Sequence, residues 1–273
     1  MNTNLIFTAK NDKITLYKAH NDEIDLNSFN PHYRERCEII LMLSGNVSYV
    51  VEGKSYRLKK WDIILSRPMQ IHNIMPDNKT RYDRYVALID HKALPEDIWQ
   101  KLRHGPDVFP CANNDRITEL FTKLDFYSSQ FSEANFASLA FSAISEVLYN
   151  LSLFNPEDTA ISINPVVSRA LSYIKENLTT IKDIDELCQN LYITKSHLHH
   201  LFSEHLQITP AKYVMTKKLM LAQRKIKKGF KPTEVYTECG FADYATFFRN
   251  YKKFFGYSPN MEGKIERPEE IIT

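Results

Sequence analysis

The chain has 273 residues, enough for one large domain or two ordinary ones, and its 43% hydrophobic and 25% charged content is typical of a soluble globular protein. No apolar run approaches the about 20 residues of a membrane span, and the polar N-terminal stretch argues against a secretory signal, so we expect a cytoplasmic protein with no membrane partner. Charge is unevenly spread, since residues 164–261 carry 15 basic and 8 acidic side chains against 20 and 25 elsewhere, which favours a polyanionic partner for the C-terminal part.

Short apolar runs separated by turn residues dominate the N-terminal part. The first, Glu38–Leu43, ends at Ser44-Gly45-Asn46, and the second, Val47–Glu52, ends at Gly53-Lys54. Four more runs follow at short spacing: Ser55–Leu58, Asp62–Leu65, Ile71–Ile74 and Tyr82–Ile89. This pattern predicts an antiparallel barrel or sandwich, which we assign to residues 1–112, with short strands or an arm over residues 1–28.

The hydrophobic period changes to that of a helix after residue 112. One apolar stripe begins at Ile117 and a wider one runs from Phe136 to Leu151, which predicts a helical hairpin over residues 113–154. A stripe this wide either docks on the barrel or pairs with its copy in a second chain, and we expect both, giving a homodimer. The polar segment 155–163 contains Pro156 and is predicted to be a linker.

The C-terminal region, residues 164–273, contains one internal repeat. Thr194 and Asp243 are N-cap residues that each open a helix, 49 positions apart. Counted from each cap, the same positions carry apolar side chains for an inner face: Leu198 and Phe202 in one helix, Phe247 and Tyr251 in the other. A long helix over residues 210–228 is predicted to join two helix-turn-helix units. Second helices about 34 Å apart fit successive major grooves on one face of DNA, so a single chain could read a bipartite site.

The opposite faces of the two helices carry side chains suited to reading DNA. Histidine and serine can hydrogen-bond base edges, arginine can bond guanine through two nitrogens, and small or aromatic side chains can touch a thymine methyl group. The predicted base contacts are Ser196, His199, His200, Ala245, Phe248 and Arg249, and the predicted phosphate contacts are Lys195, Lys252 and Lys253. Each has a plainer interpretation, because the histidines and lysines could be merely solvated and Phe248 could belong to the core.

The stretch Gly240–Pro259, GFADYATFFRNYKKFFGYSP, resembles the signature of the AraC/XylS family of bacterial transcription regulators. The resemblance extends back to about Asn164, and a weaker one to the family's N-terminal cupin domain covers residues 29–90. It implies that the outer positions of both helices lie in the major groove, that the N-terminal pocket binds a small effector, often a sugar, and that the protein contacts RNA polymerase. The sequence departs from the pattern at Cys188, Lys218 and Tyr236, and after Pro259.

Candidate effector contacts follow from this resemblance. Aromatic faces stack on sugar rings, whereas arginine, glutamate and histidine bond hydroxyl or acidic groups. The candidates are His32, Arg34, Glu38, Tyr49, Trp61, Arg67, His72, Tyr82 and Arg84, each of which could instead be ordinary barrel packing.

The expected fold is an α+β multidomain protein, with a cupin-like antiparallel β-barrel and helical hairpin followed by an all-α domain with two helix-turn-helix units. We expect a regulator that binds double-stranded DNA, without catalytic residues, metal ligands or cofactors. The alternative is a metal-dependent cupin enzyme with a DNA-binding appendage, for which Glu38 and His72 match two positions of a histidine-rich ligand set but the second histidine is missing after His32. A filled barrel acting as an interaction module is a third possibility, and the sequence leaves open whether such a regulator activates or represses.

Overall fold

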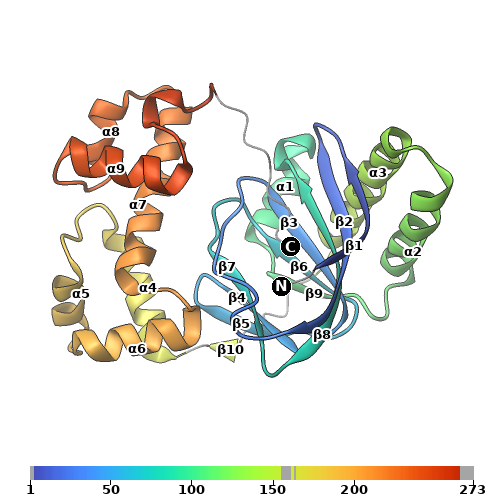
Figure 1. Ribbon diagram of the computed structural model, residues 1–273, viewed down its shortest axis with the longest axis horizontal. Coiled ribbons are helices and arrows are strands. Elements are labelled where there is room, and N and C mark those ends of the chain that lie inside the picture. Colours follow the sequence, from blue (N-terminus) through green and yellow to red (C-terminus); the bar gives the residue numbers. More distant parts are fainter. Residues whose placement is uncertain (1–2, 155–160, 163, 265–273) are drawn as a thin grey trace. The chain divides into compact units, whose positions relative to one another are not determined.

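The computed structural model describes residues 3–154, 161–162 and 164–264, and the chain divides into two compact units between Ile161 and Ser162 (Figure 1). We describe each unit by itself. Of the predicted linker 155–163, only Ile161 and Ser162 lie within the described residues, and they form the short strand β10.

Two sheets make up the β part of the first unit. A six-stranded sheet has the order β1-β2-β8-β3-β6-β9, formed by Asn4–Lys10, Ile14–Ile24, Thr80–Ile89, Cys37–Ser44, Asp62–Ser66 and Val108–Pro110. A four-stranded sheet has the order β10-β5-β4-β7, in which the last three strands are Lys54–Arg57, Val47–Val51 and His72–Pro76. The pairings between neighbouring strands from β1 through β9 are antiparallel, as predicted. The described strands nevertheless form two separate sheets and do not close into the predicted barrel.

Alternation along the central strands separates two faces of the six-stranded sheet. In β3, Cys37, Ile39 and Leu41 belong to a large hydrophobic core, so the residues between them, beginning with Glu38, point to the opposite side. We call that opposite side the inner face. It meets the four-stranded sheet, because Glu38 of β3 contacts His72 of β7.

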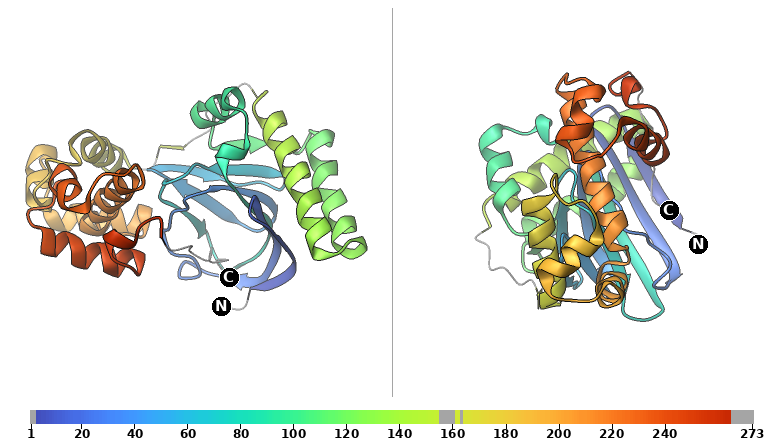
Figure 2. Two further views of the ribbon diagram at one scale, coloured as in Figure 1. Left: turned by 90° about the horizontal axis from the view of Figure 1, so that it is seen from above. Right: turned by 90° about the vertical axis from the view of Figure 1, so that its left-hand side faces the viewer.

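Helices cover the other face of the six-stranded sheet (Figure 2). They are α1 (Glu96–His104), α2 (Asp115–Gln130) and α3 (Glu133–Leu151), and a 3₁₀ turn covers His91–Ala93. The Asn114 side chain caps α2 by accepting a hydrogen bond from the Ile117 amide at 3.3 Å. The stripe on α3 packs into the same core as the sheet, where burying a side chain such as Ile144 contributes about 1.5–3 kcal/mol. The predicted helical hairpin is therefore confirmed, and it docks on the sheet.

The second unit is helical in its described residues. It consists of α4 (Pro165–Asn177), α5 (Ile184–Leu191), α6 (Lys195–Leu206), α7 (Pro210–Lys227), α8 (Pro232–Glu238) and α9 (Tyr244–Phe255), with a 3₁₀ turn at Pro259–Met261. The pairs α5–α6 and α8–α9 are the two helix-turn-helix units, and α7 lies between them in the chain. The C-cap of helix α5 is Tyr192, which takes a left-handed conformation with φ 57° and is 94% exposed.

Candidate nucleic-acid interface and interior polar cluster

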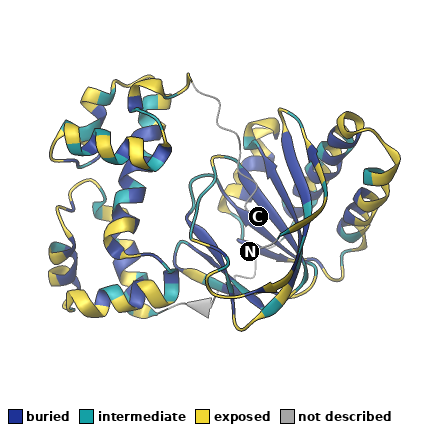
Figure 3. Cartoon of the chain, in the orientation of Figure 1, coloured by how far each residue is buried: buried dark blue, intermediate teal, exposed yellow. Residues whose placement is uncertain are grey.

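Helix α6 has one buried and one displayed face (Figure 3). Its N-cap forms as predicted, since the Thr194 hydroxyl accepts a hydrogen bond from the His197 amide at 3.2 Å. Leu198 and Phe202 are fully buried, which fixes the rotation of the helix about its axis. The predicted contact residues therefore lie on the other side, where Lys195, Ser196 and His200 are exposed and His199 is half-buried.

Acidic side chains accompany this displayed face. Lys195 forms an exposed ion pair with Asp185 at 3.1 Å, and the Nε2 atom of His200 lies 3.5 Å from a carboxylate oxygen of Glu204. Such exposed pairs are weak, so Lys195 remains available to a phosphate and His200 to a base edge. The neighbouring His197, which the sequence analysis left out, is also exposed. It lies three residues after the Thr194 cap, in the first turn of α6, and that position was the signal for it.

Helix α9 repeats this arrangement. Asp243 accepts a hydrogen bond from the Thr246 amide at 2.7 Å, and Phe247 and Tyr251 are fully buried. Ala245, Arg249, Lys252 and Lys253 are exposed, whereas Phe248 is half-buried. The Arg249 guanidinium donates only to the Thr246 hydroxyl, at 3.1 Å, among the hydrogen bonds of the described chain, so it can turn toward another acceptor.

A buried lysine on α7 connects the two helix-turn-helix units. The Lys218 side chain is 6% exposed, and its Nζ atom donates to the Ile181 carbonyl oxygen at 2.7 Å and to the Gly240 carbonyl oxygen at 2.8 Å. Ile181 lies just before α5, and Gly240 lies in the turn between α8 and α9. Burial lowers the pKa of Lys218, yet the two carbonyls still give the ammonium group acceptors. One side chain thus fixes both turns with respect to α7.

Polar side chains gather on the inner face of the first unit. His32, Glu38 and His72 come together, and the Nε atom of Arg34 lies 3.5 Å from Glu38 Oε1. The Tyr49 ring centroid lies 5.9 Å from that of His72. Two further residues, Tyr82 and Arg84, are in contact, with the guanidinium carbon 4.5 Å from the ring centroid. We call these seven residues the inner cluster.

Electrostatics link Tyr82 to the rest of the inner cluster. Burial raises the pKa of Tyr82 to about 12, Arg84 opposes that shift, and the negative charge of Glu38 adds to it. The Tyr82 hydroxyl is buried and has no hydrogen-bond partner among the described residues. A buried, unsatisfied hydroxyl costs about 1–3 kcal/mol, so this group favours a ligand that accepts or donates a hydrogen bond.

Family models match both units. One described as an AraC-like ligand binding domain covers residues 19–124, and one described as a helix-turn-helix domain covers residues 187–261. The chain belongs to the AraC family. All nine candidate effector residues fall within the AraC-like ligand binding match, and both α6 and α9 fall within the helix-turn-helix match.

Curated relatives of this AraC-family chain carry the names of transcription regulators. The probable transcriptional regulator LumQ of Photobacterium leiognathi is 32% identical over 89 residues, covering 32% of this chain and 36% of that protein. The raffinose operon transcriptional regulatory protein RafR of Pediococcus pentosaceus is 26% identical over 148 residues, covering 53% of this chain and 52% of that protein. The chain thus spans about half or less of the length of these relatives.

Solved structures resemble the chain only distantly. Unsaturated fatty acid-bound ToxT from Vibrio cholerae is 17% identical and covers 94% of this chain and 99% of its own, with a TM-score of 0.36. In the described part of this AraC-family chain, each helix is too short or too polar to cross a bilayer.

Two of the predicted effector residues lie elsewhere, and we remove them from the candidate set. The Arg67 guanidinium pairs with Asp107 and donates to the carbonyl oxygens of Leu102, Gly105 and Pro106, so it holds the segment after α1 in place. Trp61 packs against the hydrophobic core beneath the helices. Local spacing did not reveal either role. The carbonyl groups that Arg67 binds at the end of α1 lie 35 or more positions away in the sequence. Trp61 packs on the helix-covered side of the sheet, which a local pattern does not identify.

The sequence analysis also missed polar residues on the inner face. Asn21 on β2 is fully buried and accepts a hydrogen bond from Arg84 at 2.5 Å, and the Tyr49 hydroxyl pairs with that of Ser66 on β6. Asn21 stands in a strand whose alternate residues are buried, and that alternation was a signal for it.

Proposed function

We propose that the chain is a ligand-responsive, sequence-specific DNA-binding transcription regulator. The observation that carries the proposal is the duplicated helix-turn-helix, in which α6 and α9 each bury one face and expose basic or hydrogen-bonding side chains on the other. Ser196, His199, His200, Ala245, Phe248 and Arg249 are proposed to contact bases, and Lys195, Lys252 and Lys253 to contact phosphates. Phe248 is half-buried beside Tyr244, so its proposed role is limited to an edge contact with a thymine methyl group.

The inner cluster is the proposed effector site. Its arginines, histidines, glutamate and tyrosines supply donors, acceptors and aromatic faces, which suits a small polar molecule. A sugar-like effector is one such molecule, and the name of RafR refers to a raffinose operon, although that word concerns RafR alone. A metal-dependent cupin enzyme is not favoured, since the named relatives are regulators.

A second copy of the chain and RNA polymerase are the other proposed partners. The α2–α3 hairpin leaves large hydrophobic side chains exposed, including Phe126 at 60% and Leu153 at 73%. Leu153 also lines a surface pocket of about 440 Å³, together with Asn114, Asn150 and Phe154, and none of the effector candidates lines it. Replacing Phe126 by Ser should shift a dimer toward monomer in light scattering if this hairpin forms the interface.

Selection of DNA from a random pool tests the central proposal. The intact chain should enrich two short sequence blocks about one helical turn apart, because α6 and α9 would enter successive major grooves. His200→Ala should relax preference in one block and Arg249→Ala in the other. Lys101→Ala, which removes an exposed charge from α1, is the matched control and should leave both blocks unchanged. Binding that shows no preference for any sequence at moderate salt would refute the proposal.

Effector coupling has a separate test. If a ligand favours one DNA-binding arrangement, its affinity must differ with and without the selected DNA, by the same factor by which it changes DNA affinity. Equal affinities in both conditions would mean that the inner cluster binds a ligand without regulating the second unit.

A further inference from the structure

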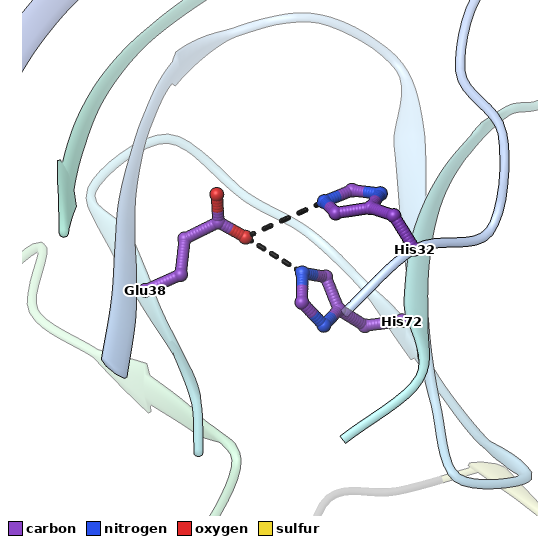
Figure 4. Close-up of side chains that lie close together, drawn as sticks. All are labelled: His32, Glu38 and His72. Atoms are coloured by element: carbon purple, nitrogen blue, oxygen red, sulfur yellow. Dashed lines mark hydrogen bonds and ion pairs between the residues drawn. The ribbon is translucent and has the colours of Figure 1, made fainter. Parts of the chain in front are cut away.

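Three side chains of the inner cluster converge from different parts of the chain (Figure 4). His32 precedes β3, Glu38 lies on β3, and His72 begins β7. The backbones of His32 and His72 are held together by two reciprocal hydrogen bonds of 3.0 and 2.9 Å. One ligand atom from each of the three side chains lies within 4.8 Å of the other two.

Backbone carbonyls decide which nitrogen of each histidine carries hydrogen. His32 Nδ1 lies 3.0 Å from the Asn30 carbonyl oxygen, and His72 Nδ1 lies 2.9 Å from the Gln70 carbonyl oxygen. A carbonyl oxygen only accepts hydrogen bonds, so both Nδ1 atoms must donate. In a neutral imidazole the Nε2 atom then carries no hydrogen and offers a lone pair. Metal-binding histidines in proteins are held in this way, with the second nitrogen bonded to a carbonyl or carboxylate.

The two Nε2 atoms face one carboxylate oxygen. Glu38 Oε2 lies 2.6 Å from His72 Nε2 and 3.8 Å from His32 Nε2. If neither Nε2 atom is protonated, three electron-pair donors face one another, and only a cation between them, a proton or a metal ion, makes this arrangement favourable. A tetrahedral ion with ligands at about 2.1 Å holds those ligands about 3.4 Å apart, which lies between the two separations.

Burial and a charged neighbour hold the Glu38 carboxylate in place. The side chains of His72 and Glu38 are only 2% and 3% exposed, so bulk water has little access to these two ligand groups. The other carboxylate oxygen faces Arg34, which orients Glu38 with Oε2 toward the histidines.

We propose that His32, Glu38 and His72 bind a divalent transition-metal ion through the two Nε2 atoms and a Glu38 carboxylate oxygen. Two imidazoles and one carboxylate suit zinc, iron(II), cobalt(II) or nickel(II) rather than magnesium or calcium. Three protein ligands leave at least one coordination position for water or an oxygen atom of an effector. The proposal revises the sequence analysis, which assigned no metal ligands, and it does not depend on the DNA-binding function because its readout is ion binding.

Cobalt(II) titration of the intact, chelator-treated chain tests the site. Visible absorption bands should saturate at one ion per chain, and zinc(II) should displace the cobalt. His32→Gln should weaken binding at least 100-fold. His91→Gln is the matched control, since the His91 side chain is 28% exposed against 24% for His32 and lies outside the inner cluster. Absence of saturable binding, or equal affinity in His32→Gln and the unaltered chain, would overturn the proposal.

A second measurement needs no substitution and so survives a variant that fails to fold. In the cobalt(II)-loaded chain, the Nδ1 hydrogens of His32 and His72 should appear as two strongly shifted proton resonances that disappear in heavy water. Both are expected because both nitrogens donate to carbonyl oxygens. Finding none or one would contradict the assigned pair of histidine ligands.

Discussion

Replacing Lys218 by methionine should loosen the second unit while leaving the first intact. Methionine keeps the apolar length of the side chain but removes the ammonium group, so the carbonyl oxygens of Ile181 and Gly240 lose its hydrogen bonds at 2.7 and 2.8 Å. Each buried acceptor left unsatisfied costs about 1–3 kcal/mol. The variant also avoids the desolvation penalty of the buried ammonium group, which offsets part of this loss in stability. We expect a net loss of about 2–4 kcal/mol.

Hydrogen exchange measured by mass spectrometry separates the two units within the intact chain. At tenfold for each 1.4 kcal/mol, the slowest amides of α7 should exchange about 30- to 700-fold faster in Lys218→Met. Trp61 and Trp99 are the chain's two tryptophans and both belong to the first unit, so their fluorescence on urea unfolding should not change. Lys212→Met removes an exposed charge from the same helix and should leave exchange within about twofold. A change of less than about 0.5 kcal/mol in Lys218→Met would refute the role of Lys218.

Gly240→Ala should destabilise the second unit by about 3 kcal/mol or more, because φ is +76° and the new Cβ would lie 2.3 Å from a backbone oxygen. Gly256→Ala is the control, since φ is +84° but nothing lies near the new Cβ, and it should cost only about 1 kcal/mol. Similar losses of stability for the two variants in thermal melts would contradict this prediction. Arg249→Ala should cost about 1–3 kcal/mol at one base, and Lys252→Ala should weaken binding to all sequences and reduce the salt slope by about one. If competition binding showed a uniform loss for Arg249→Ala and a loss at one base for Lys252→Ala, Arg249 would be the phosphate contact and Lys252 the base contact. Arg67→Met breaks a buried ion pair and should cost the first unit about 3–5 kcal/mol in urea, while a loss below about 1 kcal/mol would restore Arg67 as a candidate ligand contact.

The sequence by itself determined the duplicated helix-turn-helix. Its signals are local, because a cap and the inner positions that follow it lie within a few turns of one helix. Thr194 and Asp243 cap α6 and α9 as predicted, and the inner positions of both helices are fully buried. The strands were predictable for the same reason, since apolar runs between turn residues mark each one. The helical hairpin followed from a stripe of period 3.6 within a single stretch of chain.

Only the tertiary structure decided which polar side chains meet. Strand alternation predicts that Glu38 and Cys37 face opposite sides, but it does not say which side carries the helices or which strand of the other sheet lies opposite. His32 and His72 are joined by a backbone bridge across 40 positions, and Arg67 finds its acceptors 35 to 40 positions away. Such contacts depend on sheet order and register, which local patterns do not specify. Lys218 looked like a departure from the family pattern, and the fold made it the connection between two turns.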